Sequence, residues 1–279
     1  MLRSSMSPTP SPVGSLLRKW RLARKMTQLE LASEAEISTR HLSFVETGKS
    51  NASSEMILIL ASALELPLRE RNALLVSAGF APAYRETSLD SPDMGQVRML
   101  IDFMLKQAEP FGAVVVDGCW NLVRANTPAK LFTGIFVSDP AAVLRAGPPN
   151  MVRLLLHPAG LRERCVNWST LARDMVCRLH REVAVTHDRR LASLLDEVLA
   201  YEGVPKDWRR FDIEAPQELL LPMHVRHRGF DLRLYTAITT LGSAQDISLQ
   251  ELRIETFFPA DAKSDAQLRG LAGAGQSGS

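Results

Sequence analysis

The stretch MTQLELASEAEISTRHLSFVETGKS, residues 26–50, decides the fold of the first part of the chain. Its apolar residues recur at the spacing of two short helices joined by a tight turn. The expected inward positions are Leu29, Leu31 and Ala32 in the first helix, Ile37 in the turn, and Leu42 and Val45 in the second helix. The pattern predicts a helix-turn-helix, whose outward faces are free for DNA.

Capping residues mark the ends of both helices. Thr27 precedes Gln28 and Glu30 as a capping group, Ser38 can cap the second helix, and Gly48 ends it. Both helices are therefore expected to be short and well bounded.

Outward positions on the second helix carry short or forked hydrogen-bonding side chains that can reach base edges in a major groove. These candidate base readers are Thr39, Arg40, His41 and Ser43. Just past the helix, Lys49 is expected to attract phosphate. Phosphate would repel the Glu46 carboxylate, which is therefore expected to serve the scaffold.

This stretch resembles the XRE, or lambda-repressor-like, family in its TQLELA run, in Ser38 and Leu42, and in the ETGK segment that ends at Lys49. The resemblance implies an all-α, five-helix DNA-binding domain over residues 13–80. It also implies that Gln28 holds a phosphate and that Arg21 pairs with Glu46.

Length and composition allow a second domain. The 279 residues are 46% hydrophobic with a formal net charge of +2, which is typical of about two globular domains. With so little net charge, DNA affinity has to come from local clusters, although a basic cluster can also be an ordinary solvated helix face. The cluster in question is Arg18, Lys19, Arg21, Arg24 and Lys25.

Cysteine spacing and the first residues indicate a reducing, cytoplasmic setting. Cys119, Cys165 and Cys177 lie far apart without a CxxC pair, which argues against a disulfide framework or a zinc module. Residues 1–12 are rich in Ser and Pro and have no continuous apolar run, so we expect a flexible arm rather than a signal peptide or membrane anchor.

The rest of the chain predicts an α+β domain with an antiparallel sheet. Residues 81–95 have the composition of a linker, the domain is expected over residues 96–261, and the Gly- and Ala-rich residues 262–279 are expected to be a disordered tail. Strands and helices are distinguished by period and by β-branched or aromatic content. Helices are expected at 96–109, 127–136, 150–156, 169–186 and 188–202, and strands at 113–117, 120–126, 218–227, 229–241 and 249–260.

This order of elements resembles a PAS-like sensor fold, and residues 110–258 resemble the ligand-binding domain of MmyB-like transcription regulators. The blocks that carry the likeness include PFGAVVVDGCWNLVRANTPAKLF, NMVRLLLHP, VNWSTLARDMVCRLH and GFDLRLYTAITTLGSAQDISLQELRIETF. The resemblance implies a transcription factor whose pocket holds a small apolar, fatty-acid-like ligand, with no other cofactor.

A curved sheet covered by helices offers an apolar pocket with few polar anchors. Candidate lining residues are Trp120, Phe132, Phe136, Trp168, Met223 and Phe230, each of which can instead be simple core packing. Arg153 or His157 can anchor a ligand carboxylate, because a charge entering an apolar pocket has to be paired.

An enzyme is the competing class, and the sequence argues against it. His180 and His187 can share a helix face, but His224 and His227 are three residues apart on an expected strand and point to opposite faces. Neither HExxH nor GxSxG occurs. We therefore expect neither a metal site nor a catalytic residue.

The resulting hypothesis is a homodimeric regulator that binds operator DNA with its first domain and senses a small apolar molecule with its second. Two alternatives stay open. The second domain can serve dimerisation or recruit another protein without any ligand, or it can act as an enzyme on the molecule in its pocket.

Overall fold

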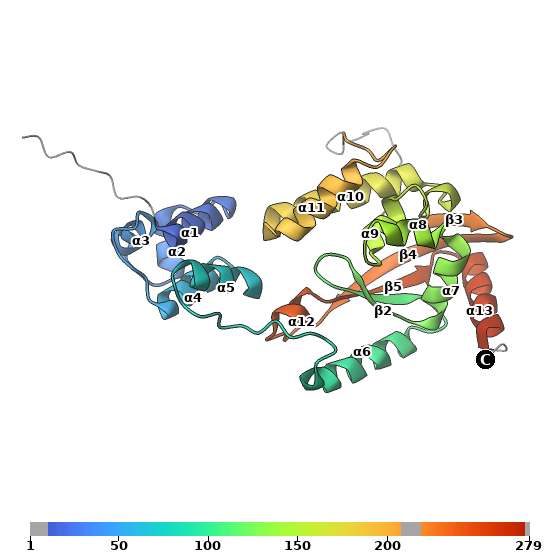
Figure 1. Ribbon diagram of the computed structural model, residues 1–279, viewed down its shortest axis with the longest axis horizontal. Coiled ribbons are helices and arrows are strands. Elements are labelled where there is room, and N and C mark those ends of the chain that lie inside the picture. The colour runs from blue at the N-terminus through green and yellow to red at the C-terminus, as the bar shows by residue number, and fades with distance from the viewer. Residues whose placement is uncertain (1–10, 208–218, 277–279) are drawn as a thin grey trace, which may run out of the picture. The chain divides into compact units, whose positions relative to one another are not determined.

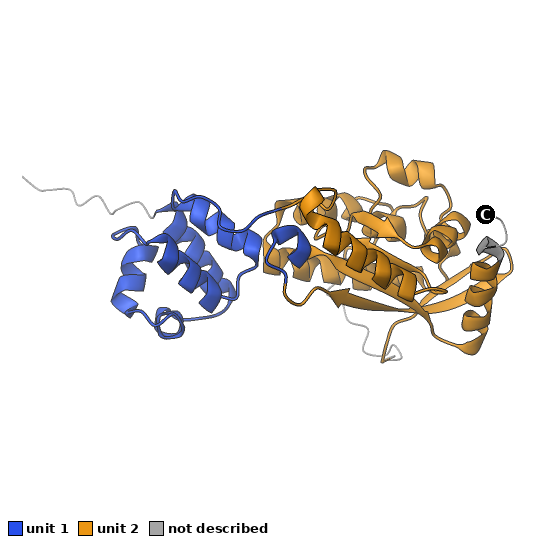
Figure 2. Ribbon diagram, turned by 90° about the horizontal axis from the view of Figure 1, so that it is seen from below, with its two compact units in different colours: residues 1–86, 244–250 blue, residues 87–243, 251–279 orange. Residues whose placement is uncertain are grey.

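The computed structural model describes residues 11–207 and 219–276. The chain divides into two compact units (Figure 2). The first contains residues 1–86 and 244–250, and the second contains residues 87–243 and 251–279. None of the described helices is long and apolar enough to cross a membrane.

Five helices form most of the first unit, as the sequence predicts. They are α1 (Pro12–Ala23), α2 (Gln28–Glu34), α3 (Thr39–Glu46), α4 (Ser54–Ala63) and α5 (Leu68–Ser77). Thr27 and Glu30 form a reciprocal capping box at the start of α2, and the Ser38 hydroxyl accepts a hydrogen bond from the His41 amide at the start of α3. The capping residues predicted from the sequence therefore form capping hydrogen bonds in the structure.

The core of this unit confirms the expected inward positions except one. Leu31, Leu42 and Val45 are fully buried, whereas Leu29 is 67% exposed. The expectation for Leu29 was wrong because two residues along an α-helix turn a side chain by about 200°, which places Leu29 nearly opposite Leu31.

A buried ion pair ties α1 to the end of α3, as the family resemblance implies. The Arg21 guanidinium donates to Glu46 through Nε at 2.7 Å and through Nη2 at 3.0 Å, and both residues are buried. Arg21 also donates to the Met26 carbonyl at 2.8 Å. Because both charges are paired and hydrogen-bonded, the pair holds the two helices in one register.

A short segment from the far end of the sequence completes the first unit. Residues 244–250 belong to it, although they lie between two strands of the second unit. The Gln250 side-chain oxygen accepts a hydrogen bond at 2.8 Å from the amide of Leu68, the first residue of α5. The preceding Pro67 offers no side-chain cap, so Gln250 caps α5 from a distant part of the chain.

The second unit is an antiparallel five-stranded sheet with helices packed on it, which confirms the predicted fold class. The strand order is β2-β1-β5-β4-β3. The strands are β1 (Ala113–Val116), β2 (Leu122–Ala125), β3 (Met223–His227), β4 (Phe230–Thr240) and β5 (Arg253–Pro259). The helices are η1 (Pro92–Met94), α6 (Gly95–Gln107), α7 (Thr127–Phe136), α8 (Pro140–Arg145), α9 (Met151–Leu156), η2 (Arg162–Arg164), α10 (Trp168–Thr186), α11 (Arg189–Leu199), α12 (Ile247–Glu251, mostly in the first unit) and α13 (Ala262–Gln276).

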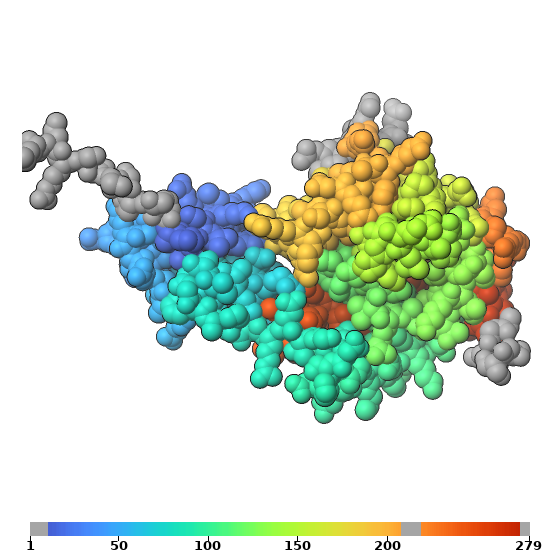
Figure 3. Space-filling view, viewed as in Figure 1, coloured from blue at the N-terminus to red at the C-terminus, as the bar shows by residue number. Residues whose placement is uncertain are grey.

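Helices cover both faces of β1, which lies between β2 and β5 in the sheet. Figure 1 shows α8 to α11 grouped on one side of the sheet and α6 on the other. All four residues of β1 are buried, although a strand with one face in water would alternate. On the outer side, α6 lies at the surface of the unit (Figure 3). It turns Ile101 and Leu105 inward and leaves Met99 and Phe103 exposed.

The structure corrects the expectation of a disordered tail after residue 261. Residues 262–276 form α13, which packs against α7, β4 and β5. Ser264 is fully buried and its hydroxyl accepts a hydrogen bond from the Arg233 amide at 2.9 Å, while Leu268 joins the core. Ser264 and Leu268 are the residues that hold this helix on the sheet, and composition alone does not reveal these contacts. The expected arm lies almost entirely outside the described residues.

Breaking the Arg21–Glu46 pair should destabilise the first unit selectively. Glu46→Ala leaves a buried guanidinium without its partner, which costs about 3–5 kcal/mol. Hydrogen exchange of the full-length chain, followed by mass spectrometry, should show faster exchange in α1 and α3 and unchanged exchange in the second unit. Glu34→Ala, an exposed change on α2, is the matched control, and equal protection in both variants would contradict the assigned role.

Candidate functional site

The predicted base readers lie on α3, whose inward side is fixed by two buried residues. Leu42 and Val45 have no exposed surface, and the four predicted readers occupy other positions around the same helix. Arg40 is exposed, and the other three predicted readers are half-buried. Their contacts with bases stay predictions; the four residues are Thr39, Arg40, His41 and Ser43.

Phe44, which the sequence reading did not single out, positions two of the predicted DNA-contacting cations. The Arg40 guanidinium carbon lies 5.3 Å from the centroid of the Phe44 ring, and the Lys49 ammonium lies 6.0 Å from it. Cation–π attraction of this kind restrains long side chains that would otherwise move freely. Gln28 is also held, since its side-chain amide donates to Glu46 at 2.7 Å.

Two members of the predicted basic cluster serve the scaffold instead. Arg21 is in the buried pair, and Arg24 donates to the Leu64 carbonyl at 3.0 Å. Arg18, Lys19 and Lys25 are exposed. The positive surface of α1 is therefore smaller than the sequence suggests.

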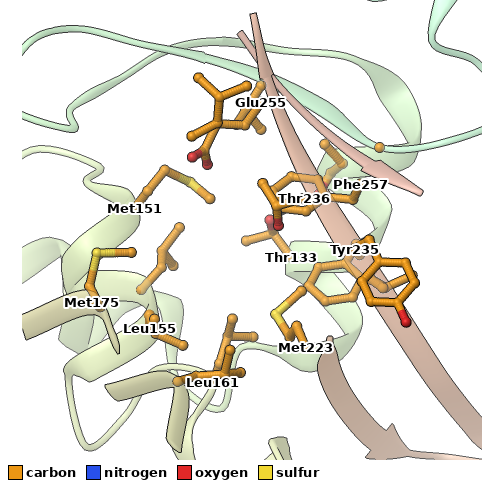
Figure 4. Close-up of a pocket in the computed structure, with 18 of the residues that line it drawn as sticks. Thr133, Met151, Leu155, Leu161, Met175, Met223, Tyr235, Thr236, Glu255 and Phe257 are labelled. Atoms are coloured by element: carbon orange, nitrogen blue, oxygen red, sulfur yellow. Dashed lines mark hydrogen bonds between the residues drawn. The ribbon is translucent and has the colours of Figure 1, made fainter. Parts of the chain in front are cut away.

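The second unit contains a cavity of about 580 Å³ between the sheet and its helices. Residues of β1, β4 and β5 line one side, and residues of α7, α9 and α10 line the other. In Figure 4, Met151, Met175 and Leu155 face the strand residues Thr236 and Phe257 across the space. Its volume lies within the range of small-molecule sites, about 300–1,000 Å³.

Three of the predicted lining residues, Trp120, Phe132 and Met223, do line this cavity. The other three aromatic residues do not, and this corrects the prediction. Phe136 is fully buried between the rings of Phe132 and Phe230, at centroid distances of 4.6 Å and 6.2 Å. Trp168 donates from Nε1 to the Leu155 carbonyl at 2.7 Å. These rings pack in the hydrophobic core, while flexible leucine and methionine side chains form much of the cavity wall.

Arg153 and His157, the predicted carboxylate anchors, are not among the lining residues. Arg153 makes a bidentate ion pair with Glu197, with both distances at 2.7 Å, which lowers the pKa of the glutamate. His157 Nδ1 accepts a hydrogen bond from the Ala159 amide at 3.1 Å. Both side chains are already used in packing α9 against its neighbours, so the prediction is corrected.

A polar cluster that the sequence reading missed lies at the cavity wall around Glu182. Its carboxylate accepts hydrogen bonds from Trp120 Nε1 at 2.8 Å, Arg178 Nε at 3.2 Å and Arg253 at 2.8 Å. The guanidinium carbons of Arg178 and Arg253 lie 4.4 and 4.9 Å from the Trp120 ring centroid. Trp120 and Arg178 both line the cavity, so a fixed cation forms part of its wall.

Glu255 places a carboxyl group in the same cavity. It stands on β5, is 5% exposed, and turns its carboxyl oxygens into the space (Figure 4). Among the described residues, none donates a hydrogen bond to it. Burial raises the pKa of Glu255, with Glu182 adding to the effect and with Arg178 and Arg253 opposing it.

By linkage, this carboxyl lowers the stability of the fold as pH rises from the usual glutamate pKa through its raised one. In that window the unfolded chain binds fewer protons than the folded chain does, so rising pH favours unfolding. A group that costs stability and is directed into a cavity is a candidate for a functional role.

Among the other candidates for chemistry, His224 has a structural partner and two of the thiols are buried. His224 Nε2 lies 2.6 Å from Asp231 Oδ1, and burial raises the pKa of the Cys119 and Cys165 thiols to about 11. Within residues 11–207 and 219–276, no three His, Cys, Asp or Glu side chains gather as a metal site would require.

The comparisons with known proteins agree with both parts of this description. The model of the MmyB-like transcription regulator ligand-binding domain matches residues 97–271, more than half of the chain. The chain belongs to this family. A helix-turn-helix model matches residues 17–71, and the chain is a DNA-binding transcriptional regulator of the XRE type with an MmyB-like ligand-binding domain.

Individual relatives and solved structures match only a part of this chain. The transcriptional regulator ClgR of Mycobacterium tuberculosis is 35% identical over 74 residues, which make up 26% of this chain and 63% of that protein. The crystal structure of the clp gene regulator ClgR from C. glutamicum is 29% identical over 25% of this chain and 86% of its own, with a TM-score of 0.22. The restriction-modification controller protein C.AhdI from Aeromonas hydrophila is 34% identical over 22% of this chain and 92% of its own, with a TM-score of 0.21.

Substitutions at Arg40 and Lys49 should separate base reading from phosphate contact. Arg40→Ala should cost about 1–3 kcal/mol at one base position and relax specificity there, if its guanidinium reads a base edge. Lys49→Ala should weaken all sequences equally and lower the salt dependence of binding. Binding to a library of operator variants at two salt concentrations measures both effects. A uniform loss for Arg40→Ala would reassign that residue to phosphate.

Proposed function

We propose that this regulator changes its occupancy of operator DNA when its cavity takes up a small apolar acid of the fatty-acid type. The protein is then a sensor and a DNA reader in one chain, without catalysis and without another cofactor. The cavity is the observation that carries the proposal, because a domain that served recruitment alone would have no need of it.

The chemistry of the cavity wall supports an apolar ligand with a polar end. Met151, Met175 and Phe257 provide flexible apolar surface, which gains from contact with an alkyl chain. Polar and charged groups at the wall include Arg178 and Glu255. A ligand with one charged end and one apolar end fits this distribution.

The path of the chain supports regulation as well as binding. β4 and β5 both line the cavity, and residues 244–250 between them belong to the first unit. Gln250 caps α5 there. A ligand that changes how β4 and β5 pack would therefore alter a segment built into the DNA-binding unit. A differential affinity of about 1.4 kcal/mol between two states of the protein suffices for a tenfold change in occupancy.

We further propose that two copies bind one operator. Helix-turn-helix dimers contact half-sites about one helical turn apart, roughly 34 Å, so a small change in dimer geometry disengages one reading helix. Light scattering of the chain bound to a single operator should give the mass of two copies. A mass of one copy per operator would contradict this.

Sequence selection on genomic DNA tests the proposed function directly. The full-length protein is assayed for selective binding as purified, after organic extraction, and after the extract or dodecanoate is added back. Selective binding that changes reversibly on addition supports the sensor. If selective binding stays the same after every addition, the protein binds DNA and its second domain serves assembly or recruitment. Chemical turnover of the added molecule would instead indicate an enzyme.

Removing the distant cap of α5 should uncouple sensing from DNA binding. Gln250→Ala deletes the acceptor for the Leu68 amide, while the predicted base readers and the cavity keep their residues. We expect the unliganded variant to bind its operator within a few-fold of wild type and to lose most of the ligand-induced change. Fluorescence anisotropy with and without dodecanoate measures both.

Gln245→Ala is the matched control, because Gln245 lies exposed in the same segment. This variant should respond like wild type. If the Gln250 variant keeps the full response, or if both variants lose it equally, the contact with α5 is not the connection between the two functions.

A further inference from the structure

The cavity holds two polar groups whose hydrogen-bonding capacity the fold leaves unused. In the described part of the chain, Arg178 donates through Nε to Glu182, while no hydrogen bond is made by its two terminal nitrogens. The Glu255 carboxyl likewise has no hydrogen-bond partner there, although the residue is 5% exposed. A buried carboxyl normally has a partner. The Arg178 side chain is 30% exposed and keeps two donor nitrogens at the wall of the same cavity, so the two residues together indicate a site for a third group.

Glu182 fixes the position of the cation in this pair. It holds Arg178 through Nε and holds Trp120 beneath the guanidinium. The terminal nitrogens of Arg178 then form a donor fork on a side chain that lines the cavity. Such a fork matches the two oxygens of a carboxylate.

Arg178 favours a ligand with a carboxylate, and Glu255 further limits which ligands can bind beside it. The charged groups around it are Arg178 and Glu182 from α10 and Arg253 from its own strand, and Asp174 and Lys130 also line the cavity. An ionised Glu255 would repel a ligand carboxylate. A neutral Glu255 instead donates its proton to that carboxylate, and an ammonium ligand would meet the positive charge of Arg178.

We propose that Arg178 and Glu255 together form the headgroup site of the cavity, where Glu255 shares one proton with a ligand carboxylate that Arg178 also pairs. Glu255 is thus a specificity-determining residue for the acid end of the ligand. This inference rests on the proposed function for the class of ligand, and adds that one proton must be bound together with each acid molecule.

Because the proton on Glu255 is bound together with the ligand, the affinity for the ligand falls as pH rises. Above the pKa of Glu255 in the free protein, one proton has to be taken up with each ligand, so the Kd rises tenfold per pH unit. The raised pKa of Glu255 brings this window closer to neutral pH than that of an ordinary glutamate.

Titration of the full-length protein with dodecanoate from about pH 5 to about pH 9 tests this linkage. Wild type should show the tenfold change per unit in the upper part of the range. Glu255→Gln offers a neutral N–H donor at every pH and should bind dodecanoate with a Kd that stays nearly constant. Asp174→Asn is the matched control, because Asp174 is another carboxylate at the cavity wall, and it should keep the wild-type pH dependence.

A second measurement keeps the test independent of the folding of any variant. Calorimetry of the wild-type protein in buffers of different ionisation enthalpy counts the protons taken up per dodecanoate bound. The count should approach one above the pKa of Glu255. A count of zero throughout, or an equally steep pH dependence in Glu255→Gln, would overturn the assignment.

The outcomes also separate this inference from the proposed function. If dodecanoate binds with the expected proton uptake but leaves DNA binding unchanged, the headgroup site stands and the proposed regulation fails. If dodecanoate changes DNA binding without a proton, the regulation stands and the role of Glu255 is refuted. If the protein binds no dodecanoate at any pH, both are wrong.

Discussion

The second unit depends on one carboxylate, that of Glu182, which accepts hydrogen bonds from Trp120, Arg178 and Arg253. These donors come from the β1–β2 hairpin, from α10 and from β5, so a single acceptor joins elements far apart in the sequence. Charge-assisted hydrogen bonds are stronger than neutral ones and have defined geometry. The strands and α10 are thereby held at a fixed separation near the cavity, and the wall there is polar rather than apolar.

The first unit uses the same principle at Arg21 and Glu46. In both units a paired charge sets the position of candidate binding groups: the pair in the first unit fixes α3, which carries the predicted base readers, and the cluster in the second fixes Arg178 at the cavity wall. A buried pair adds little net stability over an apolar contact of the same shape, but losing one partner is costly. The main effect of such pairs is therefore to hold each site in one geometry. Their net contribution to the stability of the fold is small.

The sequence predicts those features that depend on neighbouring residues. The caps at Thr27 and Ser38 and the period of the strands are local, and the structure confirms the caps and the five strands. The last strand begins at Arg253 rather than at residue 249, because residues 247–251 form α12. The tail and the carboxylate anchor failed because they depend on distant partners: α13 is stabilised by packing on β4 and β5, and Arg153 is occupied by Glu197. No local pattern distinguishes an arginine whose partner lies 44 residues away from one that is free to bind a ligand.

A signal for the missed residues was nevertheless present in the spacing. Leu171, Met175, Arg178 and Glu182 recur at helical intervals, so one face of α10 changes from apolar to charged along its length. In β5, Glu255 has the same parity as Phe257 and therefore points to the same side of the sheet. A charged residue on the inward side of a strand, facing a helix whose inward stripe ends in charge, indicates a polar site within an apolar domain. The apolar residues of such a domain locate its core, and charged residues that interrupt their pattern on an inward face are the candidates for binding a polar group.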